Sequence, residues 1–120
     1  KTADGILSVM HKDGFLPGRL YSNWKGAVRW SCLTGTSQIA CCWLKLFQLT
    51  GDTRYRDAAY KANKYVRRTV DVSGPDEIRG GVKGSFPIDG EYGSFQYLNW
   101  ACKFFIDAQM LEHEVRIYEN

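Results

Sequence analysis

Two segments of the chain are apolar on nearly every side of a helix, and they constrain the fold more than any other feature. They are residues 34–50, TGTSQIACCWLKLFQLT, and residues 99–112, NWACKFFIDAQMLE. The clear polar interruptions in these two segments are Gln38, Lys45, Gln48, Lys103, Asp107 and Gln109. A helix that is hydrophobic all round is surrounded by other protein. The sequence therefore predicts helices stacked on helices, with these two at the centre.

Residues 53–70, TRYRDAAYKANKYVRRTV, predict an amphipathic helix with one basic face exposed to solvent. Just before it, Gly51 is a predicted left-handed helix stop and Asp52 a predicted N-cap. Because a turn of about two residues joins this helix to residues 34–50, we expect an antiparallel hairpin. A short amphipathic helix is also expected at the N-terminus, ending before Gly14.

The sequence repeats several landmarks at an interval of 70 residues. The identities at this offset are Gly14 with Gly84, Pro17 with Pro87, Trp30 with Trp100 and Cys32 with Cys102. Each copy places a long loop ahead of a predicted buried helix, so we interpret residues 14–70 as one repeat and 84–120 as the start of a second. The predicted fold class is all-α, a single domain over residues 1–120 built from antiparallel α-hairpin repeats.

The spacing of the repeat favours a closed ring over an open solenoid. Solenoid repeats are usually about 33–47 residues long with short loops, whereas these loops are long and rich in aromatic residues. We therefore expect a partial (α/α) toroid in which the loops before the inner helices meet at one mouth. Six repeats at this pitch would need roughly 400 residues, so we expect the chain to form less than a third of such a ring.

The segments NWKGAVRWSCLTGTSQIACCWLKLFQLTGDTRYRDAA and IRGGVKGSFPIDGEYGSFQYLNWACKFFIDA resemble the α/α-toroid proteins. The pattern is most similar to the six-hairpin glycosidase-like group and to uncharacterised bacterial relatives associated with polysaccharide production, of which the chain resembles a fragment. Terpenoid-cyclase-like toroids are more distant, because their closely spaced aspartates are missing here. The resemblance implies that an oligosaccharide or polysaccharide, including an anionic one, binds or reacts at the loop mouth. The implied chemistry is that of a glycoside hydrolase, a lyase or an epimerase.

The two loops supply the residue types that carbohydrate sites use. Sugar rings have apolar faces and polar edges, so flat aromatic side chains combine there with carboxylates, amides and guanidinium groups. Residues 81–100, GVKGSFPIDGEYGSFQYLNW, hold five aromatics on a glycine-rich segment. The candidate substrate-binding residues are Trp24, Arg29, Trp30, Arg79, Lys83, Tyr92, Asn99 and Trp100. For Trp30 and Trp100 the favoured alternative is packing at a helix start, since each occupies the same point of its repeat.

Four residues are candidates for catalysis, namely Asp89, Glu91, Tyr97 and Asp107. Glycoside hydrolysis normally uses two carboxyl groups roughly 5–10 Å apart, and Asp89 with Glu91 would supply them, although Asp89-Gly90 is also an ordinary turn. Asp107 stands inside an apolar helix, where a buried carboxylate needs partners. For Asp107, satisfaction by a neighbouring helix is favoured over catalysis.

Basic residues in and beside the loops suit an anionic sugar. Arg19, Arg29, Arg79 and Lys83 are predicted to cluster, and guanidinium groups bind carboxylates well. Elimination from a uronate would use Tyr97 as the base, with Asn99 and Arg79 assisting.

Composition argues against several other classes of function. A net charge of +3 is too small to indicate a nucleic-acid partner, and no apolar run reaches the roughly 18 residues of a membrane span. The four cysteines lack disulfide-framework spacing, so we expect reduced thiols and a cytoplasmic location. With two histidines and no Cys-x-x-Cys pair, the sequence predicts no metal site and no cofactor.

Two hypotheses of function remain from the sequence. The first is a toroid segment that binds or acts on a saccharide at the loop mouth, with enzymatic activity left open. The second is a non-catalytic helical-repeat interaction module whose loop aromatics are buried. In either case one amphipathic helix cannot cover two all-apolar ones, and exposed apolar surface drives association. We therefore expect residues 98–112 to be covered by self-association or by the remainder of a parent chain.

Overall fold

The computed structural model describes residues 1–119 and contains four helices and one small sheet in that range. The helices are α1 (Thr2–Val9), α2 (Leu33–Thr50), α3 (Thr53–Thr69) and α4 (Asn99–Glu119). The strands have two residues each and are β1 (Ser31–Cys32) and β2 (Ser85–Phe86). The prediction of a mostly helical domain is confirmed, and the two-stranded sheet is an addition to it.

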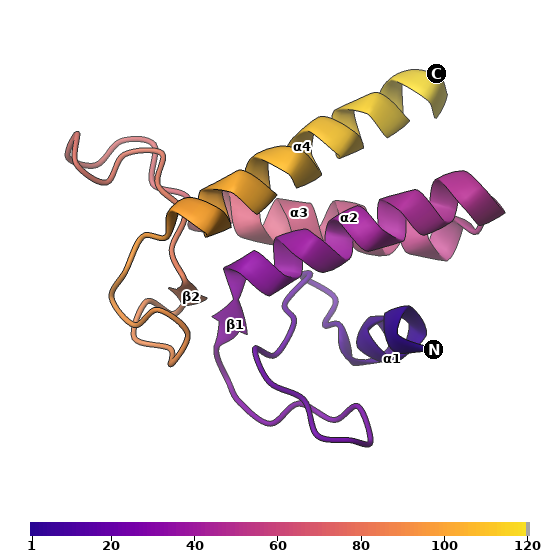
Figure 1. Cartoon of the computed structure of the whole chain (residues 1–120), viewed down its shortest axis with the longest axis horizontal. Helices are drawn as coiled ribbons and strands as arrows, with labels where there is room; N and C mark the ends of the chain where they lie inside the picture. Colours follow the sequence, from indigo (N-terminus) through magenta and orange to yellow (C-terminus); the bar gives the residue numbers. More distant parts are fainter. Residues whose placement is uncertain (120) are drawn as a thin grey trace.

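The connection between α2 and α3 is the tight turn that the sequence predicts. Gly51 has a left-handed backbone conformation, with φ of 72°, which glycine adopts without a steric penalty. Its N–H donates to the Phe47 carbonyl at 2.8 Å and ends α2. Asp52 then caps α3, because its carboxylate accepts a hydrogen bond from the Arg54 N–H at 3.0 Å. The two helices consequently fold back on each other (Figure 1).

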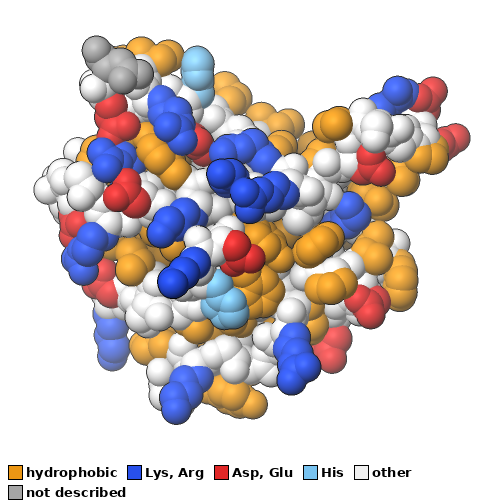
Figure 2. All heavy atoms as spheres, turned by 180° about the vertical axis from the view of Figure 1, so that it is seen from behind, with side chains coloured by type: hydrophobic (Ala, Val, Ile, Leu, Met, Phe, Trp, Pro, Cys, Tyr) orange, Lys and Arg blue, Asp and Glu red, His pale blue; other side chains and the backbone are white. Residues whose placement is uncertain are grey.

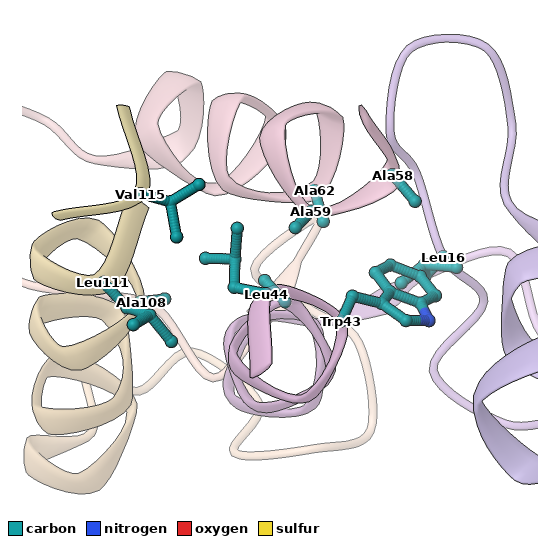
Figure 3. Close-up of a cluster of buried hydrophobic side chains, with 10 residues drawn as sticks. Leu16, Trp43, Leu44, Ala58, Ala59, Ala62, Ala108, Leu111 and Val115 are labelled. Atoms are coloured by element: carbon teal, nitrogen blue, oxygen red, sulfur yellow. The ribbon is translucent and has the colours of Figure 1, made fainter. Parts of the chain in front are cut away.

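Helix α2 is the central element of the core. In Figure 1, α4 runs beside α2 in the same direction and α3 lies behind them. Leu44 points toward α3 and α4, whereas Trp43 points the other way, toward Leu16 of the first loop (Figure 3). Both side chains are fully buried, and the Trp43 indole N–H donates to the Ala3 carbonyl of α1 at 3.1 Å. The stripe that α3 presents to this core consists of small residues, Ala58, Ala59 and Ala62.

Helix α4 is covered on one side only, which corrects the expectation that residues 99–112 are surrounded by protein. Its buried positions include Ala101, Ala108 and Leu111. The large apolar side chains that it exposes are Trp100, Ile106, Met110, Ile117 and Tyr118. The helix also continues past the predicted end at residue 112 and runs to Glu119, since Val115 is buried against the core.

A buried carboxylate joins α4 to α3. The side chain of Glu112 is only 6% exposed and accepts hydrogen bonds from Asn63 Nδ2 at 2.8 Å, Arg67 Nη1 at 2.9 Å and Arg116 Nε at 2.9 Å. Burial opposes the ionisation of Glu112, but these three donors outweigh it and hold its pKa below the ordinary value. The network fixes how α4 lies on α3.

The outer face of α3 is basic, as the sequence predicts. Its exposed positions include Lys61, Lys64 and Arg68. Figure 2 shows many Lys and Arg side chains on the surface seen from this side. None of the helices in residues 1–119 combines the length and the hydropathy that crossing a membrane requires.

Candidate functional site

The two aromatic-rich loops meet at the small sheet. Strand β1 pairs antiparallel with β2, with Ser31 opposite Phe86 and Cys32 opposite Ser85. The Leu33 N–H, at the start of α2, donates to the Gly84 carbonyl at 3.1 Å. The segments that lead directly into α2 and α4 therefore lie together at one end of the molecule, whereas the rest of the first loop extends beneath α2 toward α1 (Figure 1). We call this region the loop junction and define it as residues 18–19, 29–32, 85–92 and 99–100.

An ion pair and a tryptophan connect the loops across the junction. Arg19 Nη1 lies 2.6 Å from Glu91 Oε2, and the Arg19 guanidinium carbon is 5.4 Å from the centroid of the Trp30 ring. The same ring lies against Gly18, where any Cβ would collide with it. Both members of the ion pair are more than half exposed, so the pair contributes no more than about 1 kcal/mol to stability. Its main consequence is positional, because it places Glu91 beside Trp30.

A pocket of about 240 Å³ opens at the junction. It is lined by Arg29, Trp30, Pro87, Asp89 and Gly90, which come from both loops. Arg29 and Asp89 are exposed, so the pocket combines an indole with one guanidinium and one carboxylate. This combination provides an apolar surface, donors and acceptors within one small volume.

Tyr92 of the second loop and Trp100 of the first turn of α4 form an exposed aromatic pair, and Trp100 lines a separate open pocket of about 500 Å³ with Asn99, Lys103 and Phe104. Ser85 is fully buried; its hydroxyl donates to the Tyr92 carbonyl at 2.6 Å and accepts from the Tyr92 N–H at 3.1 Å. The Trp100 indole N–H in turn donates to Tyr92 Oη at 3.0 Å. Trp100 is 48% exposed and Tyr92 36%, and Phe95 of the same loop is 71% exposed. The aromatic pair is thus fixed by hydrogen bonds while its rings stay accessible.

Several predicted binding residues lie apart from the pocket lining. The Trp24 ring packs against Gly5 of α1. Tyr97 lies against Gly81, with Lys83 Nζ 5.6 Å from its ring centroid.

The predicted cluster of basic residues is dispersed in the structure. Lys83 Nζ donates to the Thr69 carbonyl at 2.6 Å, at the end of α3. Arg79 forms an ion pair with Asp76, and Arg19 forms one with Glu91. The four residues therefore serve different local contacts, and of them only Arg29 lines the pocket at the junction.

Asp107 is not the buried carboxylate that the apolar helix suggested. Its side chain is 44% exposed and pairs with Lys103 one turn earlier in α4. Because α4 is covered on one side only, residue 107 falls on the open side, where it lines a shallow groove with Cys41 and Lys45 of α2. Asp107 therefore lies outside the loop junction.

Asn99 and the two tryptophans Trp30 and Trp100 lie near the starts of α2 and α4. Asn99 Oδ1 accepts a hydrogen bond from the Trp100 N–H at 2.8 Å and shapes the beginning of α4. Trp30 precedes β1, whereas Trp100 lies inside the first turn of α4. The two tryptophans consequently do not occupy equivalent places relative to their helices, and Trp100 is more exposed than packing at a helix start requires.

The cysteines and histidines offer no second kind of site in residues 1–119. All four cysteines are free thiols. Burial raises the pKa of the Cys32 thiol, although hydrogen bonds from the Gly35 and Thr34 backbone oppose the rise, so this cysteine of the junction is protonated at neutral pH. The described part of the chain contains no group of three or more His, Cys, Asp or Glu side chains arranged to hold a metal ion.

The structure adds Pro87 and Gly90 to the residues that the sequence singled out at this site. Gly90 approaches both Ser85 and Trp30 closely, so that a side chain there would collide with them. In the sequence, only Gly18 in the first loop and Gly90 in the second indicate this close packing. The partner of Arg19 is 72 positions away and could not be read from the sequence.

Comparisons with protein-family models, curated proteins and solved structures find no match to this chain. Its function is therefore inferred from the chemistry of the loop junction.

Proposed function

We propose that the chain binds an oligosaccharide or polysaccharide at the loop junction. The proposal rests on the accessible aromatic pair, Tyr92 and Trp100, together with the pocket that presents Trp30 with Arg29 and Asp89. Aromatic faces stack on the apolar faces of sugar rings, and the charged groups supply hydrogen bonds to hydroxyl groups.

The ring architecture is part of the same proposal. Helices α2 and α4 run in the same direction, α3 returns behind them, and the segments directly before α2 and α4 lie at one end (Figure 1). This arrangement supports a partial (α/α) toroid, in which inner helices run parallel and the loops before them form a mouth. A saccharide bound at the junction would then lie across that mouth.

The same site leaves room for a reaction on the bound sugar, of the hydrolase, lyase or epimerase kind. Asp89 and Glu91 are the carboxylates of the second loop that lie at the junction, and Asp89 lines the pocket. Arg19 Nη1 lies 2.6 Å from Glu91 Oε2, and this contact orients the Glu91 carboxylate. In a two-carboxylate mechanism Asp89 would be the group that lines the pocket and Glu91 the group held by an ion pair.

A glycan array followed by calorimetric titration tests the proposal. We expect at least one oligosaccharide to bind the purified chain, and we expect the double substitution Trp30→Ala with Trp100→Ala to abolish that binding. The circular dichroism spectrum of the variant should remain that of a folded helical protein. Absence of binding across the array and in titrations of polysaccharides would contradict the proposal.

A second candidate function is that of a non-catalytic helical-repeat interaction module. It is favoured by the open side of α4, where Ile106, Met110 and Ile117 are about half exposed or more. Exposed apolar surface of this extent commonly marks an interface. As expected from the sequence, the occupant would be another copy of the chain or the remainder of a longer protein. The two functions use different ends of the molecule and can coexist.

A further inference from the structure

The distribution of charge at the loop junction bears on the class of sugar that the proposed site accepts. An anionic sugar would be bound by several basic groups acting together. In the structure Arg79 is neutralised by Asp76, and Lys83 is engaged by the carbonyl at the end of α3. Arg19 is at the junction, but Glu91 lies 2.6 Å from it. No free cluster of positive charge therefore faces the pocket.

The pocket itself is electrically balanced. Its lining contains one cation, Arg29, and one anion, Asp89. Neither side chain has an ion-pair partner among residues 1–119. Arg19 and Glu91, which lie on the neighbouring side of Trp30, add one charge of each sign. The four charged side chains of the junction sum to zero.

Neutral hydroxyl groups fit this lining better than a carboxylate does. A hydroxyl both donates and accepts, so two adjacent hydroxyls of one sugar can satisfy a carboxylate and a guanidinium at once. Of the charged groups in the pocket lining, only Arg29 attracts the carboxylate of a uronate, and Asp89 repels it from within the same pocket.

We propose that the junction selects uncharged sugar units over uronates and that Asp89 is the specificity-determining residue. This inference rests on the proposed function, since it names the class of saccharide that the same site takes. It narrows the range left open by the sequence, which included anionic sugars.

The test compares one oligosaccharide with its own C6-oxidised form, so that a carboxylate is the only difference. The probes are cellotetraose, mannotetraose and maltotetraose, each before and after oxidation to the uronate, titrated into the full chain. We expect the neutral member of the pair that binds to bind about fivefold more tightly, since the site is exposed and the repulsion partly screened. Raising the salt concentration should narrow the difference by weakening only the repulsion of the uronate.

Two substitutions move the preference in opposite directions. Asp89→Asn removes the repulsion, so we expect tighter binding of the uronate, weaker binding of the neutral sugar and loss of the discrimination. Arg29→Gln removes the only cation of the pocket lining, so the discrimination should widen. Asp57→Asn is the matched control, because Asp57 lies on α3 beside Arg56 and should leave both affinities unchanged. Circular dichroism establishes that each variant is folded.

The possible results distinguish a failure of the inference about uncharged sugars from a failure of the proposed saccharide binding. Tighter binding of the uronate by the unaltered chain, or unchanged discrimination in the Asp89→Asn variant, overturns the inference and leaves the proposed function standing. If neither class binds the unaltered chain or the Asp89→Asn variant, the proposed function fails, and the inference fails with it.

Discussion

The Trp100 indole N–H donates a hydrogen bond to Tyr92 Oη at 3.0 Å, and this contact ties the first turn of α4 to the loop that precedes it. The main chain of Tyr92 is held in turn by the buried hydroxyl of Ser85, next to the β1–β2 pairing. Two aromatic rings are therefore anchored to the small sheet through a chain of hydrogen bonds. An anchored ring loses little conformational freedom when a ligand stacks on it, which favours affinity.

This contact leads to the first prediction, which concerns binding. Trp100→Ala should weaken saccharide binding about five- to tenfold, because an aromatic contact contributes about 1 kcal/mol. Tyr92→Phe keeps the ring and loses only the acceptor, so a smaller loss is expected. Tyr118→Ala, which alters an exposed ring toward the opposite end of α4, is the control for calorimetry. Equal losses in the Trp100→Ala and Tyr118→Ala variants would contradict a site at the junction.

The second prediction separates a core tryptophan from a surface one. Trp43 is fully buried and bonded to the Ala3 carbonyl, so Trp43→Ala should lower the free energy of unfolding by about 3–5 kcal/mol. Trp100→Ala should lower it by less than about 1 kcal/mol, since half of its surface is already in water. Urea denaturation of both variants measures the difference. Similar stabilities would show that Trp43 is not part of the core.

The third prediction concerns acid stability and Glu112. Its pKa is depressed in the folded state, so the carboxylate stabilises the fold above the ordinary value of 4.5, and this stabilisation is lost as the pH falls through the lower, folded-state pKa. Glu112→Gln should cost about 2 kcal/mol at neutral pH, the contribution of hydrogen bonds to a charged group. The variant should also lose less stability than the unaltered chain on acidification.

The control for this substitution lies two residues away on the same helix. Glu114 is exposed, so Glu114→Gln should leave both the stability and its pH dependence nearly unchanged. Thermal melts between neutral pH and roughly pH 3 distinguish the two variants. A Glu112→Gln variant as stable as the unaltered chain at every pH would contradict a structural role for the network.

The fourth prediction concerns association through α4. Met110 is 66% exposed in the middle of the open side, and Met110→Glu should shift any self-association toward the monomer by at least about tenfold in the dissociation constant. Lys64→Glu, on the outer face of α3, should have no such effect. Sedimentation velocity of the unaltered chain and of the two variants measures their self-association. A strictly monomeric unaltered chain that melts cooperatively would contradict association by the isolated chain.

Local signals in the sequence predicted the helical hairpin well. Gly51 and Asp52 act within their own turn, so a stop and a start could be placed from neighbouring residues alone. The beginning of α4 at Asn99 was predicted for the same reason. The amphipathic character of α3 also follows from spacing along one helix, and the structure places its basic face outward.

Features that depend on distant partners could not be predicted. Glu112 reads as a surface residue, and only the approach of Asn63 and Arg67 from another helix explains its burial. The pairing of β1 with β2 involves two residues on each side and leaves no periodic pattern. Asp107 was expected to be buried because its helix is apolar all round, yet the helix has a covered side and an open one.

At the candidate site, too, local sequence predicted some features, and others depend on distant partners. The aromatic and charged residue types of the two loops marked the region, but the dispersal of the basic residues depends on local partners such as Asp76 and the Thr69 carbonyl. Trp24 was a candidate for substrate binding and Tyr97 for catalysis, and each lies against a glycine away from the pocket lining. Trp100, for which packing was favoured, is nearly half exposed.

The most direct test of the account is a nuclear magnetic resonance titration that follows the four tryptophan indole N–H signals as saccharide is added. Single Trp→Phe variants assign the signals of Trp24, Trp30, Trp43 and Trp100. A site at the loop junction predicts that the signals of Trp30 and Trp100 move together along one binding curve, while those of Trp24 and Trp43 stay in place. Saccharide that shifts only Trp24 or Trp43, or none of the four at saturation, would contradict it.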